Sequence, residues 1–338
     1  MKSKWDVPFR YVFSGSLTMR MHDMLLGTKD FEPLDILVAQ EDRNGIKQAI
    51  QWKHEGFCRW LFCDSGAYSV HTGKLHVTQD EYVAYINSVC DDIDVFAQLD
   101  TIPGKFKQPK SPEDYVQSAE DSWANFLHMR ENVEDKHKVM PVYHFGEDTK
   151  YLKRMLEYRD NEGDQLDYIG LSPANDASVQ ARMLYLKDMY DIIKHSSNPN
   201  VKTHVYGFTS LTAMSKFPCY SADSISHRLV SGYNKIFTRN FGIISVSKQP
   251  RSVKTKSNLS FLETADDYNL NILRSEFSDF GIDLEFAKKF GFEGDDILDW
   301  IPDDNNIRVV FSIRTIQTLI KTKYKYSQEN LVSQRKLF

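Results

Sequence analysis

The sequence predicts an α/β protein whose main part is a TIM-type (β/α)8 barrel with helices appended at its C-terminus. Eight short runs rich in β-branched and aromatic residues alternate with longer segments of helical pattern, as expected of βα units around a parallel sheet. The 338 residues fit a single large barrel, and a hydrophobic content of 41% suffices for a sizeable core.

Strands and helices are expected to follow one another along most of the chain. The predicted strands are Tyr11–Ser14, Asp35–Ala39, Trp60–Cys63, Val95–Leu99, Val139–Tyr143, Tyr168–Leu171, Thr203–Tyr206 and Ser221–Ser224. The predicted helices are Asn44–His54, Gln79–Cys90, Pro112–Glu131, Lys150–Arg159 and Ala177–His195. The helix at Pro112 has the clearest start, because Ser111 is a typical N-cap and proline suits the first helical position. The acids Glu113 and Asp114 complement its dipole.

We expect the chain to have two parts. Residues 1–256 are predicted to form the catalytic barrel. Residues 257–338 mix acidic and aromatic residues before a basic end, and we interpret them as a helical extension packed on the barrel. No internal repeat or low-complexity linker separates the two.

Composition excludes several classes of protein. No run of about 18 apolar residues predicts a membrane span, and the N-terminus lacks the apolar stretch of a signal peptide, so we expect a cytoplasmic protein without a membrane partner. The cysteines form neither a CxxC pair nor a Cys/His cluster; they are Cys58, Cys63, Cys90 and Cys219. This spacing argues against a disulfide framework and against a zinc site. We expect no metal and no cofactor.

Basic residues are concentrated in two stretches, although the net charge of the chain is −5. From Ser224 to Leu262 the sequence contains no Asp or Glu, and a second basic stretch runs from Arg308 to Lys336 with the single acid Glu329. We interpret these stretches as surfaces that grip a phosphate backbone, and solvated faces without a partner are the alternative. The candidate nucleic-acid-binding residues are Arg228, Arg239, Lys248, Arg251, Lys254 and Lys256.

Acids and glycines gather at the C-terminal ends of the predicted strands, which form the active face of an α/β barrel. These ends read Asp64-Ser65-Gly66-Ala67-Tyr68, Asp100-Thr101, His144-Phe145-Gly146, Gly170-Leu171-Ser172, Tyr206-Gly207-Phe208 and Asp223-Ser224. A carboxylate can act as nucleophile, general acid/base or ligand, so three of them together favour glycosyl transfer. Any one of them alone is better explained as a helix N-cap or a salt-bridge partner. The glycines allow a flat purine to approach the backbone closely.

In these residues the sequence resembles the tRNA-guanine transglycosylase family, over Trp60 to Ser226, about half of the chain. Asp64-Ser65-Gly66-Ala67-Tyr68 is similar to the family motif Asp-Ser-Gly-Gly-(Phe/Tyr), with Ala67 in place of the second Gly. The resemblance implies that Asp223 is the nucleophile and Asp64 the general acid/base. It also implies a set of base-binding residues: Ser65, Tyr68, Asp100, His144, Gly170, Leu171, Tyr206 and Gly207.

The reaction implied by this resemblance replaces a guanine in nucleic acid with a 7-deazaguanine such as preQ0. Asp223 would attack C1′ of the target nucleoside, while Asp64 protonates the leaving guanine and deprotonates the incoming base. Chemistry of this kind requires the target to be flipped out of the stack or already single-stranded.

Two departures from the family pattern bear on the partner. His144 stands where the family usually has Gln, and no cysteine follows Cys219, so the family's zinc subdomain is missing. The sequence is therefore more similar to the divergent branch of bacteriophages and DNA-modification gene clusters. DNA is favoured over tRNA as the partner, in the host cytoplasm if the protein is phage-encoded. A homodimer and the identity of the 7-deazaguanine stay open.

Other functions are compatible with the same residues. A transglycosylase acting on tRNA would use the same acids. A barrel nucleosidase or glycoside hydrolase would use water as the acceptor instead of a base. A nucleic-acid-binding accessory protein without activity is the alternative from a different class.

Overall fold

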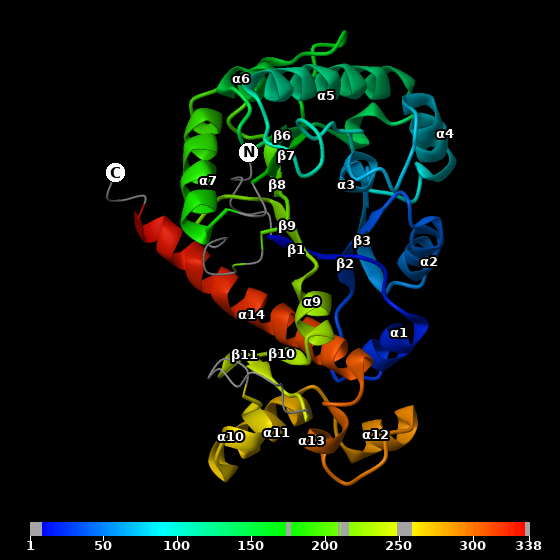
Figure 1. Cartoon of the computed structure of the whole chain (residues 1–338), viewed down its shortest axis with the longest axis vertical. Coiled ribbons are helices and arrows are strands. Elements are labelled where there is room, and N and C mark those ends of the chain that lie inside the picture. Colours follow the sequence, from blue (N-terminus) through cyan, green and yellow to red (C-terminus); the bar gives the residue numbers. More distant parts are fainter. Residues whose placement is uncertain (1–8, 174–176, 209, 211–215, 249–258, 335–338) are drawn as a thin grey trace. The chain divides into compact units, whose positions relative to one another are not determined.

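The computed structural model describes residues 9–173, 177–208, 210, 216–248 and 259–334, with side chains up to residue 322 (Figure 1). The chain divides into two compact units. Unit 1 comprises Met1–Ser16 and Pro33–Ser224, and unit 2 comprises Leu17–Glu32 and Ile225–Phe338. The boundary predicted after residue 256 therefore differs from this division. The reason is that the last strand of the sheet ends at Ser224, and the elements after it contact the long C-terminal helix.

Unit 1 contains one parallel sheet with the strand order β5-β4-β3-β2-β1-β9-β8-β7-β6. The strands are β1 Arg10–Ser14, β2 Leu34–Ala39, β3 Cys58–Asp64, β4 Val95–Ala97, β5 Val139–Met140, β6 Val142–His144, β7 Tyr168–Ser172, β8 Lys202–Val205 and β9 Ser221–Ser224. All eight predicted strands are present. The sheet has nine strands rather than eight because the predicted run Val139–Tyr143 is divided at Pro141, which has no amide hydrogen for a ladder bond.

The division at Pro141 also explains why the sheet is nearly closed. β5 pairs with β4, and β6 pairs with β7, so the two ends of the strand order are neighbours along the chain. The predicted α/β class with a parallel, barrel-like sheet is confirmed, and a TIM-type barrel is consistent with it.

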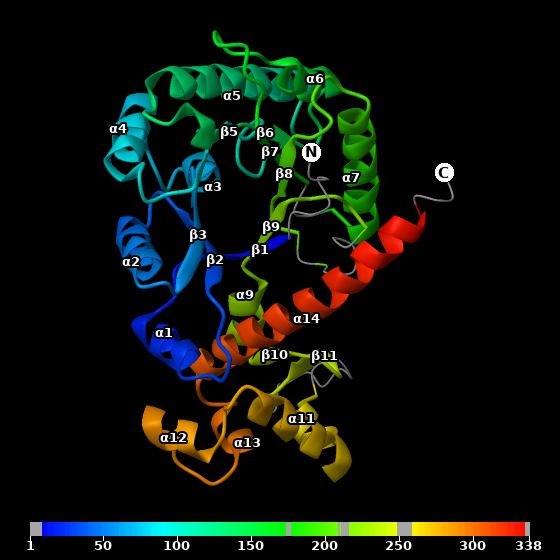
Figure 2. The same ribbon diagram turned by 180° about the vertical axis from the view of Figure 1, so that it is seen from behind.

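Helices lie around the outside of the sheet of unit 1 in both opposite views (Figures 1 and 2). They are α2 Arg43–His54, α3 Ala67–His71, α4 Gln79–Val89, α5 Pro112–Asn132, α6 Thr149–Glu157 and α7 Val179–Lys194, with a 3₁₀ turn at Lys136–Lys138. The five predicted helices are present, and α3 was not predicted. The predicted cap of α5 is confirmed, because the Ser111 side chain accepts a hydrogen bond from the Asp114 amide.

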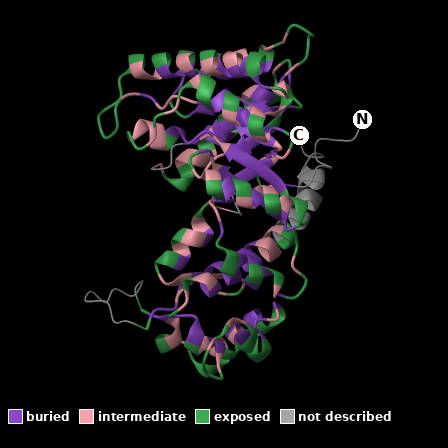
Figure 3. Cartoon of the chain, turned by 90° about the vertical axis from the view of Figure 1, so that its right-hand side faces the viewer, coloured by how far each residue is buried: buried purple, intermediate pink, exposed green. Residues whose placement is uncertain are grey.

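The interior of the sheet is filled by apolar side chains at alternate strand positions. Strand residues two apart point to the same side. Trp60 and Phe62 on β3, together with Val12 on β1 and Val142 on β6, belong to one buried cluster. Figure 3 shows strands in the interior of unit 1 as mostly buried, whereas the helices around them carry exposed residues as well as buried ones. Two residues further toward the C-terminal end of each of these strands, the inward position holds a polar residue: Ser14 on β1, Asp64 on β3 and His144 on β6.

Unit 2 is mainly helical, as predicted for the residues after 257. Its elements are α1 Met19–Leu26, α9 Ser226–Gly232, the antiparallel pair β10 Lys235–Thr238 and β11 Gly242–Ser245, α10 Phe261–Thr264, α11 Asp267–Asp279, α12 Leu284–Phe290, α13 Ile297–Trp300 and α14 Asn305–Gln334. The rings of Phe277 and Phe311 stack in its core with centroids 3.7 Å apart. Among the described residues, no helix is both long enough and apolar enough to cross a membrane.

Removing Phe62 should destabilise unit 1, because its ring is fully buried at the centre of the apolar cluster. We expect Phe62→Ala to lower the free energy of unfolding by about 3–5 kcal/mol, as for other large-to-small core substitutions. Urea denaturation measures this value. Phe106→Ala is the matched control, because that side chain is 41% exposed and should change stability by less than about 1 kcal/mol. Equal losses in the two variants would contradict the packing described here.

Candidate active site

Polar side chains form the last inward layer at the C-terminal ends of the strands of unit 1. Ser14 follows Val12, Asp64 follows Phe62, and His144 follows Val142, each two residues further along its strand. Asp223 has the corresponding place on β9, two residues after Ser221. The alternation that buries the apolar interior therefore also directs these polar groups to one end of the sheet.

Asp64 is a carboxyl group with an unusual protonation state. Burial raises its pKa from 3.8 to about 7, and the negative charge of Asp100 adds to this effect. The amide of Gly66 donates a hydrogen bond of 3.2 Å to Oδ2 and opposes the shift. A carboxyl with this pKa exchanges a proton near neutral pH, as general acid/base catalysis requires.

Asp100 is held by two neighbours. Ser65 Oγ donates to Oδ1 at 2.7 Å, and His144 Nε2 lies 2.8 Å from Oδ2. The Ser65 side chain is fully buried, so its part is to position Asp100 rather than to reach a ligand. Each carboxylate oxygen retains a further lone pair that can accept a hydrogen bond from a bound molecule.

His144 is charged because carboxylates face both of its ring nitrogens. Nδ1 lies 3.1 Å from Glu147 Oε1, and the backbone amide of His144 donates to Glu147 Oε2. Burial alone would lower the pKa of His144, but the hydrogen bonds to Asp100 and Glu147 raise it to about 10. With both nitrogens protonated, the ring donates to Asp100 and cannot accept from it.

Asp223 is fixed as an ionised carboxylate. Ser14 Oγ donates to Oδ2 at 2.5 Å, and the Gly207 amide donates to Oδ1 at 2.8 Å. Nε2 of the buried His204 lies 3.4 Å from Oδ1, an ion-pair distance without hydrogen-bond geometry. Burial would raise the pKa of Asp223, but these neighbours lower it. The pKa of Asp223 is therefore shifted below the ordinary value of an aspartate, whereas the pKa of Asp64 is shifted above it.

The predicted glycine contacts differ in kind. Gly207 has φ +59°, and its amide binds Asp223 instead of being free for a base. At Gly170 an added Cβ would come within 2.9 Å of the Tyr206 ring, so the glycine makes room for that ring. The Gly170 amide donates to the Pro141 carbonyl, and the Leu171 carbonyl accepts from the Tyr206 amide. These backbone groups of Gly170 and Leu171 therefore form hydrogen bonds along the sheet.

Tyr206 and Tyr68 are placed differently. Burial and the charge of Asp64 raise the pKa of Tyr206 well above its ordinary value, and its ring packs against His204 with centroids 4.5 Å apart. Tyr68 on α3 is 62% exposed. Its ring contacts Phe106 edge to face, with centroids 6.3 Å apart.

The basic residues proposed to bind nucleic acid lie in unit 2 or outside the described residues. Arg239 forms an ion pair with Asp279 at 2.5 Å, and Lys248 with Asp303 at 3.0 Å, so part of this charge is used internally. Arg228 is half-buried on α9. The other three, Arg251, Lys254 and Lys256, lie outside the described residues.

The second basic stretch is also partly used inside unit 2. Arg308 is buried and donates to the carbonyls of Ser231, Ile301 and Pro302. Arg314 is buried and donates to the carbonyls of Lys29 and Asp30. Neither guanidinium is available to a phosphate.

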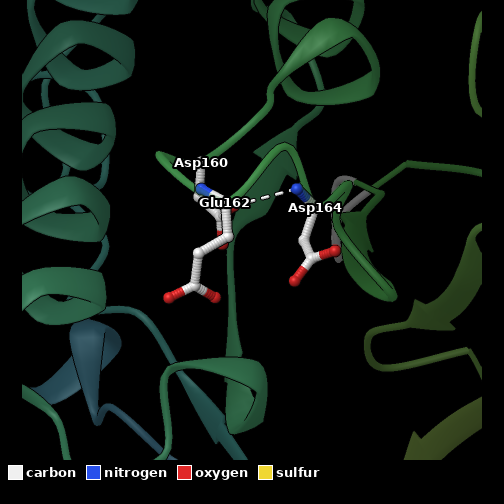
Figure 4. A group of neighbouring side chains, drawn as sticks. All are labelled: Asp160, Glu162 and Asp164. Atoms are coloured by element: carbon white, nitrogen blue, oxygen red, sulfur yellow. Dashed lines mark hydrogen bonds between the residues drawn. The ribbon is translucent and has the colours of Figure 1, made fainter.

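One acidic group lies away from this rim, in the loop after α6 (Figure 4). The Glu162 and Asp164 amides donate to Asp160 Oδ1. Lys136 Nζ lies 2.9 Å from Asp160 and 2.7 Å from Glu162, and Arg130 also pairs with Asp160. These cations pair with two of the three carboxylates, Asp160 and Glu162, so the group is explained as a salt-bridged turn. The four cysteines are buried and unpaired.

Sequence reasoning missed three residues that complete the site. Ser14 and His204 lie at inward positions of β1 and β8, so the two-residue alternation would have found them. Glu147 lies in the loop after β6, where strand alternation no longer applies.

A scan against models of known protein families and a search of curated proteins both found no match.

Asp64→Asn should stabilise the protein at high pH. The wild-type carboxyl favours the folded state fully below pH 4, and this contribution is lost as pH rises through about 7, because the folded pKa is raised. An amide has no charge to desolvate. Relative to wild type, the variant should gain about 1–3 kcal/mol at pH 8 and almost nothing at pH 4, a range set below the full linkage value because Asp64 is partly solvated.

Urea denaturation across this pH range measures the difference. Asp91→Asn, the same change at an exposed position, should run parallel to wild type. A parallel profile for Asp64→Asn as well would mean that Asp64 titrates as an ordinary carboxyl.

Proposed function

We propose that the chain is a base-exchange transglycosylase that replaces guanine in DNA with a 7-deazaguanine such as preQ0. The observation that carries the proposal is the different environment of two carboxyl groups in one polar rim: Asp223 accepts hydrogen bonds from Ser14 and Gly207, whereas burial dominates the surroundings of Asp64. Asp223 is held ionised by donors, and Asp64 is held near pKa 7 by burial. Two titratable groups whose environments separate their pKa values are the usual basis for dividing nucleophile from acid/base.

In the first half-reaction, the Asp223 carboxylate forms a bond to C1′ of the target nucleotide. The bond between C1′ and the guanine nitrogen breaks, and its electron pair leaves with the guanine. Asp64 gives its proton to this guanine. The products are a neutral base, an ester on Asp223 and an ionised Asp64.

In the second half-reaction, the 7-deazaguanine attacks C1′ and displaces the Asp223 carboxylate. The proton lost from the incoming ring nitrogen returns to Asp64, so both side chains recover their starting states. No redox step or cofactor is needed, because every bond change is a displacement balanced by one proton.

Asp100 supports recognition of the base. Guanine and 7-deazaguanine present N–H donors on one edge, and a carboxylate is an acceptor for such donors. The charged His144 can only donate to Asp100, so it keeps Asp100 in the form that accepts. The substitution of His for the family's Gln thus supports an altered way of holding the same edge.

The fold supports the same function. In TIM-type barrels with eight βα units, the active site lies at the C-terminal ends of the strands, where these acids stand. The base must leave the stack to reach this rim, at a cost of a few kcal/mol. We favour DNA over tRNA because the sequence lacks the zinc subdomain of the resembling tRNA enzymes.

Guanine exchange tests the proposal directly. With radiolabelled guanine, wild-type protein should transfer label into DNA, and preQ0 should compete. Asp223→Asn should abolish exchange and any covalent adduct seen on denaturing gels, because an amide cannot attack C1′. Asp64→Asn should keep a trace of activity, about 10²–10⁴-fold reduced, because only proton transfer is lost.

Asp91→Asn is the control and should exchange normally. An adduct that persists in Asp223→Asn, or one mapped to Asp64, would reverse the two assignments. Label found in tRNA but not in DNA would move the substrate to RNA. Release of guanine without uptake of label would identify a nucleosidase, with water as acceptor.

A further inference from the structure

The loop of residues 101–111, between Asp100 and α5, is basic, and its residues 105–111 are exposed. Lys105, Lys107 and Lys110 fall within six positions, and the segment contains no acid. All three lysines are exposed. Within the part of the chain that the structure describes, no carboxylate lies at ion-pair distance from their ammonium groups. Their charge is therefore not used in ion pairs, in contrast to that of Arg239 and Lys248 in unit 2.

Aromatic rings stand beside these lysines in the solvent. Phe106 is 41% exposed and contacts the 62% exposed Tyr68 edge to face. The His71 ring also contacts Phe106 edge to face, with centroids 5.8 Å apart. Lys107 Nζ lies 5.3 Å from the Phe106 ring. Exposed rings interleaved with unpaired cations are the composition of surfaces that bind single-stranded nucleic acid.

The segment is attached directly to the acidic rim. It begins one residue after Asp100, and the Thr101 amide donates to Ser122 Oγ on α5 at 2.8 Å. Asn125, also on α5, donates to the Leu99 carbonyl at 2.6 Å. Tyr68 lies on α3, which starts three residues after Asp64. The chain therefore leads within a few residues from two acids of the rim, Asp64 and Asp100, to the residues of this surface.

We propose that Lys105, Phe106, Lys107 and Lys110, together with Tyr68, form a surface that binds a single-stranded stretch of the nucleic acid next to the target guanine. The two rings stack on bases, and the lysines neutralise the neighbouring phosphates. A single strand is the occupant because only unpaired bases expose faces on which a ring can stack. The inference rests on the proposed function, since it supplies the strand from which the rim receives its base.

Salt-dependent binding tests the lysines. The probe is oligothymidylate of about 12 nucleotides, within the usual site size, which has no guanine for the acidic rim. Lys105→Ala, Lys107→Ala and Lys110→Ala combined should weaken binding. The slope of log affinity against log salt should become flatter by about 2, because each phosphate of a single strand that a lysine neutralises contributes roughly 0.7 to that slope. The matched control combines Lys153→Ala, Lys187→Ala and Lys194→Ala, three exposed lysines on α6 and α7 of the same unit.

Phe106→Ala tests the stacking. It should reduce affinity for the single strand by roughly 5- to 140-fold, the range seen when one stacking ring is removed, and leave the salt slope unchanged. Binding to duplex of the same length should be weaker than to single strand and insensitive to Phe106→Ala. Equal slopes in both lysine triples, or an unaffected Phe106→Ala, would overturn the assignment. Tighter binding of the duplex than of the single strand would mean that the surface binds double-stranded DNA instead.

Calorimetry with free guanine separates this inference from the proposed function. Wild type and the Lys105/Lys107/Lys110 triple variant should bind the base equally. If guanine binds but the triple variant grips oligothymidylate as wild type does, the surface is wrong and the base-exchange proposal stands. If guanine does not bind while the triple variant loses oligothymidylate affinity, the exchange proposal fails and the surface stands.

Discussion

Electrostatic repulsion among three carboxyl groups at one end of a barrel-like sheet is the constraint to which the rest of the site responds. Burial acts to raise the pKa of both Asp64 and Asp223, and the charges of Asp100 and Asp223 add to the cost of ionising Asp64. Three ionised carboxylates in one partly dry rim would be costly. Asp64 responds by holding its proton up to about pH 7, whereas Asp223 and Asp100 each have their own donors.

Those donors depend on the order of the strands in the nearly closed sheet. Ser14 reaches Asp223 because β1 pairs with β9, and Gly207 reaches it from the end of β8 on the other side. His144 reaches Asp100 from β6, which follows β5, the partner of β4, directly after Pro141. An open sheet ending at β5 would lack the position from which His144 donates. Closure of the sheet and neutralisation of the acids are therefore linked.

The sequence allowed the strands and their polar ends to be predicted, because period-two burial and strand-end acids are local signals. It did not reveal that Ser65 and Gly207 hold acids, since their partners lie 35 and 16 residues away. Nor did the sequence indicate that residues 17–32 group with the chain after Ser224, because this grouping depends on contacts distant in sequence. The basic stretch that begins at Ser224 contains no acid of its own, yet Arg239 forms an ion pair with Asp279 on α11, which lies outside that stretch.

In the proposed exchange, the pair Asp64 and Asp223 carries the same charge at every stage. Before attack, Asp64 is protonated and Asp223 is ionised. After attack, Asp223 is an ester and Asp64 is ionised, so one negative charge has moved between them and none has been gained. Burial and the charge of Asp100 account for most of the raised pKa of Asp64, and loss of the charge on Asp223 removes a smaller contribution, so the proton becomes easier to give as the ester forms. Because the net charge is constant, no counter-ion has to enter or leave the rim as the charge moves from Asp223 to Asp64.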